Sequence, residues 1–226
     1  MANTARGKAL IADDHGLYRT GLAYLLRDQL GFQNILEVGD FDAALDLLAL
    51  ERDCQIALFD LSMPGMGGAD SLVIVRETYP ALKVAVVSAS EERADVLAVL
   101  AAGLGGYVPK SLADDEIVAA LESVMAGQVY VPRFMTQHVP GQRFLPPVPQ
   151  PAQQSETRVA DLTPRQRDVL KGVLRGLSNK EIARELDIAE GTVKIHLSAL
   201  FTHLGARNRT DLAARSRALF GADLDR

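Results

Sequence analysis

The sequence predicts an α/β doubly wound fold, with a five-stranded parallel sheet, followed by a small all-α domain that contains a helix-turn-helix. Short apolar runs alternate with helical patterns over residues 1–127. Prolines interrupt every regular pattern over residues 128–160, and residues 161–226 show helical patterns only. Alternating strands and helices favour a parallel sheet covered by helices. We therefore expect two domains, 1–127 and 161–226, joined by a proline-rich linker over 128–160.

The five strands are indicated by near-continuous apolar runs at 8–13, 35–38, 56–60, 84–88 and 106–110. About five helices are expected around them. In one helical pattern, a single face carries Leu17, Gly21, Leu22, Leu25 and Leu26. In another, a single face carries Ile117, Ala120, Leu121 and Val124. Strands that are apolar throughout are typical of parallel sheets buried on both sides. The functional crevice of such a sheet lies beyond the carboxyl ends of its strands.

The linker is indicated by repeated prolines, namely Pro132, Pro140, Pro146, Pro147, Pro149 and Pro151. Such repetition excludes a regular helix and favours an extended, semi-stiff chain. A short helical turn around 134–138 is the exception that we expect.

The helices of the second domain begin at recognisable capping residues. Thr163 followed by Pro164 and Gln166 is a capping box with proline at the first helical position, and Ser178 with Glu181 forms a second box. Gly176 is placed to end the first helix, and Asn208 is placed to cap a last helix that reaches residue 219. Four helices are therefore expected in this domain.

The net charge of −5 is divided unevenly along the chain. Residues 1–127 carry 9 Lys and Arg against 19 Asp and Glu, whereas residues 161–226 carry 12 against 9. An acidic first part and a mildly basic last part suggest different partners for the two domains. No apolar stretch approaches the roughly 18–20 residues that span a bilayer. We also expect no secretion signal. Cys54, the single cysteine, excludes a disulfide within the chain and is expected in the core, so the sequence favours a cytoplasmic location without membrane contact.

Polar side chains occur at the carboxyl ends of four predicted strands. The carboxylates Asp13 and Asp14 follow the first strand and Asp60 follows the third, while Ser88 ends the fourth and Lys110 the fifth. These ends meet at one edge of a parallel sheet. Clustered carboxylates favour a hard cation such as Mg²⁺. A metal, a lysine and a hydroxyl around one aspartate are the groups that stabilise phosphoryl oxygens.

These residues, in the segments IADDH, FDLSMPGMGG, VVSAS and GYVPKS, resemble the response-regulator receiver family, which has a flavodoxin-like fold, over about residues 7–127. The resemblance implies that Asp60 accepts a phosphoryl group from a sensor histidine kinase. It implies that Asp13, Asp14, Asp60 and the backbone carbonyl of Ser62 hold Mg²⁺. Lys110 would pair with the phosphoryl group, Ser88 would turn inward to bond it, and Tyr107 would follow by moving its ring inward. Gly16 departs from the proline that relatives usually have there.

Enzymatic alternatives fit the sequence less well. Haloacid-dehalogenase-type phosphatases also form an aspartyl phosphate, but they need a second aspartate where this chain has Ser62. No GxxxxGK[ST] loop is present, and the glycines at 103, 105 and 106 precede a strand instead of following one. His15 could be read as a metal ligand, although a place in the first turn of a helix is the better interpretation. We expect a phosphoryl acceptor and not an enzyme.

A helix-turn-helix is predicted by a helix at 178–186, a short turn at 187–189 and a helix from 190 onward. A stripe made of Val193, Leu197, Leu200 and Leu204 should face the core. Lys194, Ile195 and Ser198 lie off that stripe, and their chemistry suits base edges in a DNA groove. The alternative from the residues alone is that Ile195 packs on the last helix and Lys194 is merely solvated.

The segments LTPRQRDVL, GLSNKEIARELDIAEGTVKIHL and LGARNRTDLAARS resemble the DNA-binding domain of LuxR-type (NarL/FixJ) regulators over about residues 158–220. The resemblance implies base-edge contacts from Lys194, Ile195 and Ser198, and a dimer contact by the last helix. It further implies phosphate contacts from Ser178, Asn179, Lys180, Thr192, His196 and Arg209. Ser198 stands where relatives often have lysine, and Ala189 cannot cap the second helix as serine would.

Together these features predict a phosphorylation-dependent transcription regulator that binds promoter DNA as a homodimer. Without phosphate, the acidic domain would restrain the DNA-binding domain or keep it monomeric. A constitutive regulator that uses the first domain only for dimerisation is the alternative.

Overall fold

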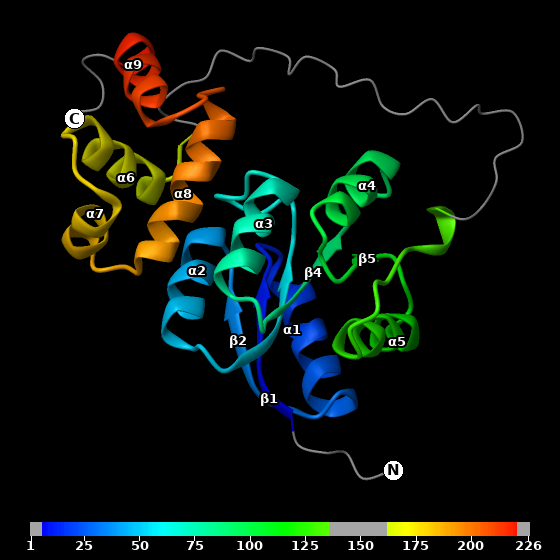
Figure 1. Cartoon of the computed structure of the whole chain (residues 1–226). Coiled ribbons are helices and arrows are strands. Elements are labelled where there is room, and N and C mark those ends of the chain that lie inside the picture. Colours follow the sequence, from blue (N-terminus) through cyan, green and yellow to red (C-terminus); the bar gives the residue numbers. More distant parts are fainter. Residues whose placement is uncertain (1–5, 136–161, 221–226) are drawn as a thin grey trace, which may run out of the picture.

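The computed structural model describes residues 6–135 and 162–220, and it contains an α/β domain and a helical domain (Figure 1). In chain order, the α/β domain consists of β1 (Arg6–Ala12), α1 (Gly16–Tyr24), the π-helical turn η1 (Leu25–Gln29), β2 (Phe32–Val38), α2 (Phe41–Leu50), β3 (Cys54–Phe59), α3 (Ala69–Thr78), β4 (Lys83–Ser88), α4 (Arg93–Ala101), β5 (Tyr107–Pro109) and α5 (Asp114–Met125).

The five strands form one parallel sheet in the order β2-β1-β3-β4-β5. This order confirms the predicted doubly wound fold. The second strand is longer than its apolar run suggests because Phe32, Gln33 and Asn34 also belong to it. The fifth strand is shorter than expected, because it begins only after Gly106 and ends at Pro109.

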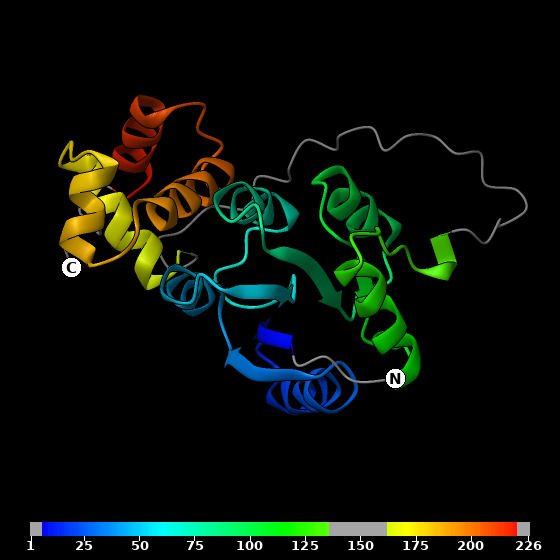
Figure 2. The same ribbon diagram turned by 60° about the horizontal axis from the view of Figure 1, so that its bottom comes forward.

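Helices cover both faces of the sheet (Figure 2). One core, between the sheet and α2, α3 and α4, includes the buried Phe41, Leu45, Phe59, Leu72 and Val96. The other core, between the sheet and α1 and α5, includes the buried Leu22, Leu26, Phe32, Ile117 and Leu121. Cys54 begins β3 and is buried there, as the sequence predicts.

The predicted apolar face of α1 is wrong at its N-terminal end. Leu22, Leu25 and Leu26 are buried as expected, but Gly21 is exposed and Leu17 is 90% exposed. The helix begins at Gly16, and its first turn lies outside the core that covers this face of the sheet. Helical spacing alone does not reveal where a helix leaves its core.

The chain after α5 remains attached to the sheet as far as it is described. The N–H of Tyr130 donates to Gly105 at 3.0 Å, and the N–H of Tyr107 donates to Tyr130 at 3.2 Å. A 3₁₀ turn, η2 (Arg133–Met135), follows. It coincides with the start of the helical turn expected at 134–138, of which 136–138 lie outside the described residues.

The helical domain contains α6 (Pro164–Leu174), α7 (Asn179–Leu186), α8 (Glu190–His203) and α9 (Arg209–Phe220). Both predicted capping boxes are present, at Thr163 and at Ser178. Asn208 caps the last helix, because its side chain accepts from the N–H of Asp211 at 2.9 Å. Gly176 follows α6 with φ of 80°, a conformation that favours glycine.

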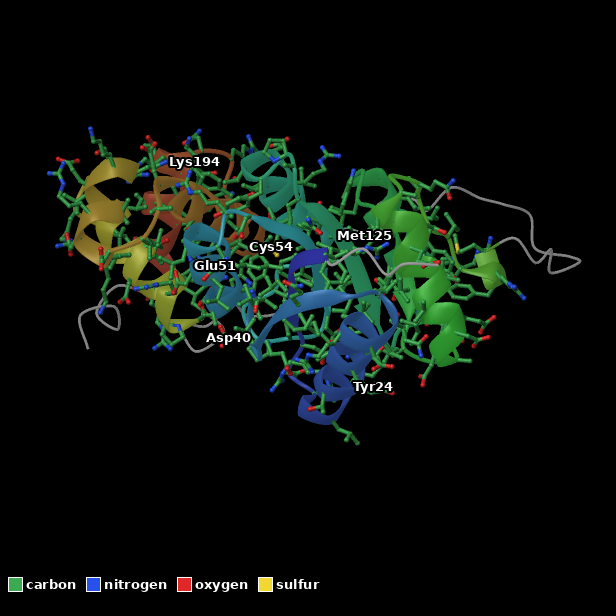
Figure 3. The ribbon with its side chains drawn as sticks, turned by 90° about the horizontal axis from the view of Figure 1, so that it is seen from below. Tyr24, Asp40, Glu51, Cys54, Met125 and Lys194 are labelled. Atoms are coloured by element: carbon green, nitrogen blue, oxygen red, sulfur yellow. The ribbon has the colours of Figure 1, made fainter. Side chains whose placement is uncertain are left out.

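The two domains pack against each other through α8, which lies along α3 and next to α2 (Figures 1 and 2). Figure 3 shows Asp40 and Glu51, which flank α2, on the side of the α/β domain that faces the helical domain. None of the helices within the described ranges is both long and apolar enough to cross a membrane.

Candidate functional site

The predicted strand-end residues gather at one edge of the sheet. Asp13 follows β1 and Asp60 follows β3, and both side chains are only 2% exposed. Lys110, which follows β5, places Nζ 2.6 Å from Asp13 Oδ2 and 3.1 Å from Asp60 Oδ2. Backbone bonds between neighbouring strands fix this geometry, since the N–H of Asp60 donates to Ala12 at 2.9 Å and the N–H of Lys110 donates to Ser88 at 2.8 Å.

The charges of the pocket fit a divalent cation. Asp13, Asp14, His15 and Asp60 each offer a ligand atom, and these atoms lie within 4.8 Å of one another. Lys110 is the single lysine among three carboxylates, so the pocket keeps a negative charge. Two buried carboxylates so close together are costly without further neutralisation. Oxygen ligands of this kind suit Mg²⁺. Ser62 is near, because its N–H donates to Asp60 Oδ1 at 3.3 Å.

His15 has a structural role in this arrangement. It is the N-cap residue of α1, and its N–H donates to Asp13 Oδ1 at 2.9 Å. Its Nδ1 lies 2.7 Å from Asp14 Oδ1 but 4.0 Å from Asp60 Oδ2. Its Nδ1 also lies 3.3 Å from Asp13 Oδ1, so the side chain is next to both carboxylates, and the residue stands at the start of a helix as expected.

Tyr18 is a pocket residue that the sequence analysis missed. Lys110 Nζ lies 4.8 Å from the centre of the Tyr18 ring, within the range of a cation–π contact. Burial and then the negative charges of Asp13 and Asp60 raise the pKa of the Tyr18 phenol, which therefore stays neutral. The signal that could have revealed it is weak, because Tyr18 resembles any other aromatic residue of an amphipathic helix.

Ser88 and Tyr107 connect the pocket to the loop after β4. Both are buried, and the Ser88 hydroxyl oxygen accepts from the N–H of Ser90 at 3.2 Å. The Tyr107 hydroxyl donates to the carbonyl of Ser90 at 2.6 Å. Burial raises the pKa of Tyr107, so its hydroxyl remains a donor. The Tyr107 ring is thus already inside in this structure.

The helix-turn-helix has the predicted spacing. Asp187 ends α7 in the left-handed conformation with φ of 55°, and Ala189 begins α8 without a side-chain cap. The predicted stripe of α8 is buried in the core of the helical domain, at Val193, Leu197, Leu200 and Leu204.

The residues of α8 assigned to DNA are divided by burial. Lys194 is exposed (Figure 3), and Ser198 is partly exposed. Thr192, Ile195 and His196 are at most 1% exposed. Ile195 belongs to the hydrophobic core of the α/β domain, so it does not pack on the last helix as the alternative interpretation holds.

Contacts with α2 and α3 account for this burial. Thr192 lies next to Tyr79, just after α3, and its buried hydroxyl oxygen has no hydrogen-bond partner among the described residues. His196 Nδ1 lies 3.5 Å from Asp42 Oδ1 of α2. A Cβ placed on Gly191 would come within 2.8 Å of the Thr78 side chain of α3. The α/β domain therefore covers the part of α8 that carries Thr192, Ile195 and His196, and it leaves Lys194 exposed.

The remaining predicted DNA contacts lie at the start of α7. Ser178 and Lys180 are exposed, and Asn179 is partly exposed. Arg209 donates to Asn179 Oδ1 at 3.0 Å and also to the carbonyl of Leu177. Partial burial lowers the pKa of Arg209. This side chain therefore holds the start of α7 in place.

Comparisons with known proteins agree with this geometry. The profile of the response regulator receiver domain matches residues 9–122, and the profile of bacterial regulatory proteins of the luxR family matches residues 160–216. The glycerol metabolism activator of Pseudomonas putida is 36% identical over 211 residues, which cover 89% of this chain and 91% of that protein. The nitrate/nitrite response regulator protein NarL of Escherichia coli (strain K12) is 32% identical over 213 residues, with coverage of 94% and 96%.

Among solved structures, the RcsB response regulator of Salmonella typhimurium shares the fold. It is 22% identical, with a TM-score of 0.55 over 95% of this chain and 100% of that chain. The profile matches and the identity with NarL lead to one conclusion: the chain belongs to the NarL family of response regulators, which join a receiver domain to a LuxR-type helix-turn-helix domain.

Proposed function

We propose that this response regulator receives a phosphoryl group on Asp60 from a sensor histidine kinase and then binds promoter DNA as a homodimer, in the cytoplasm. It belongs to a family of regulators and is not a conventional enzyme. One observation carries the proposal: the domain that contains the Asp60 pocket also buries Ile195 and His196, two of the α8 residues assigned to DNA. A change in the pocket can therefore decide whether that face is available.

The pocket is suited to accept the phosphoryl group. A carboxylate oxygen of Asp60 would attack phosphorus, and the bond from phosphorus to the kinase's histidine nitrogen would break, leaving the electron pair on that nitrogen. Lys110, 3.1 Å from Asp60, would neutralise charge on the transferred group. Asp13, Asp14, Asp60 and the carbonyl of Ser62 would hold Mg²⁺. The ion, when bound, neutralises phosphoryl oxygens.

The loop after β4 offers a route from the pocket to the linker. Ser88 would turn its hydroxyl toward a phosphoryl oxygen, which changes its bond with Ser90. The carbonyl of Ser90 also accepts a hydrogen bond from the Tyr107 hydroxyl. The backbone N–H of Tyr107 in turn donates to the carbonyl of Tyr130. Arg93, at the start of α4, donates to the carbonyl of Met135 at 3.2 Å. Movement of this loop would therefore disturb the attachment of the linker.

Release of α8 would expose Thr192, Ile195 and His196 beside Lys194, which is already exposed. Lys194, Ile195 and Ser198 would then contact base edges in the major groove. The phosphate contacts would come from Ser178, Asn179, Lys180, Thr192, His196 and Arg209. Two helices of this kind in a dimer would read half-sites about one helical turn apart.

A constitutive regulator is the second candidate function, but the burial of Thr192, Ile195 and His196 disfavours it. Such a protein would have to keep its DNA-reading face accessible.

Phosphorylation is tested with purified protein, Mg²⁺ and acetyl phosphate, followed by intact mass spectrometry. The wild type should gain one phosphoryl group, and Asp60→Asn should gain none. A wild type that stays unmodified, or an Asp60→Asn variant that is modified equally, would contradict the assignment.

A further inference from the structure

A set of carboxylates on α2 faces the helical domain where α8 and the start of α6 meet. Asp42 and Asp46 are four residues apart and therefore lie on one side of α2. Arg165 Nη2 of α6 lies 3.5 Å from Asp46 Oδ2, and His196 Nδ1 of α8 lies 3.5 Å from Asp42 Oδ1. Thr163, the N-cap of α6, lines the same cavity as Asp42.

We propose that Arg165, Thr163 and His196 form a binding site for the DNA phosphate backbone, and that Asp42 and Asp46 occupy this site in place of phosphates while the domains are packed together. The inference rests on the proposed DNA-binding function and adds Arg165 to its contacts. It also assigns a role to α2 as an internal competitor of DNA.

The position of the site supports this assignment. Thr163, Arg165 and His196 meet the same α2 surface that α8 meets with the face assigned to DNA. A duplex that replaced α2 and α3 along α8 would bring its backbone to the place where the α2 carboxylates lie. Arginine binds carboxylate and phosphate with similar geometry. An anion held next to α6 would also lie near the positive end of an 11-residue helix.

In the packed state, some polar atoms of this site lack hydrogen-bond partners within the described part of the chain. His196 is 1% exposed, and its Nε2 has no hydrogen-bond partner among the described residues. Asp42 Oδ1 is likewise buried without a hydrogen-bond partner within residues 6–135 and 162–220. The Arg165–Asp46 ion pair of 3.5 Å is loose, and a cavity of about 660 Å³ lies beside it, lined by both residues and by Asp40 and Asp168. A buried polar group without a partner is costly, so the contact can be exchanged for a better one.

The first experiment measures how salt affects DNA binding by the phosphorylated full-length protein. The DNA is a duplex selected by that protein from a random pool. The logarithm of the DNA-binding constant falls linearly with the logarithm of the salt concentration, and loss of one phosphate contact makes this negative slope less steep by about 1. Arg165→Gln should show this decrease and weaken binding to all duplexes alike, whereas Arg165→Lys should keep the wild-type slope. Arg175→Gln is the matched control, because Arg175 follows the other end of α6 and pairs with Glu185.

The second experiment tests competition by the α2 carboxylates. Without phosphorylation, Asp46→Asn should raise DNA affinity severalfold, and adding Arg165→Gln should remove much of that gain. If phosphorylated wild type binds DNA but Arg165→Gln has the same slope and affinity, the inference is wrong and the proposed function stands. If phosphorylated wild type selects no DNA, both are wrong. Arg165→Lys separates loss of the cation from a folding defect, which circular dichroism would detect in Arg165→Gln.

Discussion

His196 of α8 faces Asp42 of α2 across the interdomain contact, with His196 Nδ1 3.5 Å from Asp42 Oδ1. Ile195, directly before His196, and Thr192, one turn earlier, are also buried. A residue assigned to a DNA phosphate therefore has a carboxylate as its neighbour. In the proposed mechanism, the packed arrangement is the state from which phosphorylation releases α8.

A single methyl group at Gly191 should open the interface. Gly191→Ala would bring Cβ within 2.8 Å of the Thr78 side chain, and overpacking of this kind costs about 1–3 kcal/mol. DNA affinity of the unphosphorylated variant, measured by fluorescence anisotropy, should rise severalfold.

The control removes the obstacle without changing α8. Thr78→Ala together with Gly191→Ala should return the affinity toward that of wild type, because the added methyl then has room. A double variant as open as Gly191→Ala alone would show that helix propensity, and not the contact with Thr78, is responsible.

The Asp42–His196 pair should make the interface respond weakly to acid. Burial, and then the charge of Arg165, lowers the pKa of His196 to about 4. Burial, with the charges of Asp40 and Asp46, raises the pKa of Asp42 to about 6. The packed state thus favours neutral His196. This preference stabilises the packed state at neutral pH, and the stabilisation is lost as pH falls from the ordinary histidine pKa of about 6.5 toward 4. The packed state also favours protonated Asp42, and this preference adds stability to the packed state as pH falls through 6. The two effects oppose each other.

Substitution of either residue should reveal the effect of the other. As pH falls from 6 to 4.5, the interdomain contact should open in the Asp42→Asn variant and become tighter in the His196→Gln variant. In the wild type the contact should change little. Fluorescence energy transfer between dyes on Arg27→Cys and Thr202→Cys, two exposed positions, reports the opening. Cys54 is buried, and burial raises its pKa to about 11, so it should not be labelled. If energy transfer changed with pH in the same direction in both variants, the two residues would not have opposing effects.

Removal of one pocket carboxylate should stabilise the α/β domain. Asp13 and Asp60 share Lys110 while buried, so Asp13→Asn relieves charge repulsion worth on the order of 1 kcal/mol. Mg²⁺ should raise the Tm of wild type and have less effect on the variant. Asp14→Asn, at an exposed carboxylate, should stabilise less. A lower Tm for Asp13→Asn than for wild type would argue against the repulsion.

Arg93 should hold the start of the linker against α4. Its guanidinium donates to the carbonyls of Phe134 at 3.5 Å and Met135 at 3.2 Å. Arg93→Ala should therefore speed trypsin cleavage after Arg133 severalfold, and phosphorylation of wild type should do the same. Cleavage after Arg27, an exposed residue of η1, serves as the internal reference. Equal rates after Arg133 in variant and wild type would exclude this role.

Local sequence signals predicted most of the fold and the pocket. Apolar strand runs located the sheet, and the carboxyl-end rule placed Asp13, Asp60 and Lys110 within bonding distance. The capping residues Thr163 and Ser178 located two helix starts. These features depend on residues that are neighbours in the sequence or on a general property of parallel sheets.

The interdomain contact could not be predicted in this way. Ile195 suits a thymine methyl and a protein core equally well, so its type does not decide between them. Arg165 and Asp46 lie far apart in the sequence, and although Arg165 belongs to the segment LTPRQRDVL, nothing in that segment indicates a contact with Asp46. Leu17 has the spacing of a core residue, yet it projects beyond the sheet. Such contacts depend on how whole elements pack, which local patterns do not encode.

The central claim is that phosphorylation of Asp60 releases α8 from the α/β domain for DNA. The most direct test measures energy transfer between the Arg27→Cys and Thr202→Cys dyes, and DNA affinity, in the same samples with and without acetyl phosphate and Mg²⁺. Phosphodonor should lower energy transfer and tighten DNA binding together in the otherwise wild-type protein, and should change neither when Asp60→Asn is added. Tighter binding with unchanged energy transfer, or the same response with Asp60→Asn, would contradict the claim.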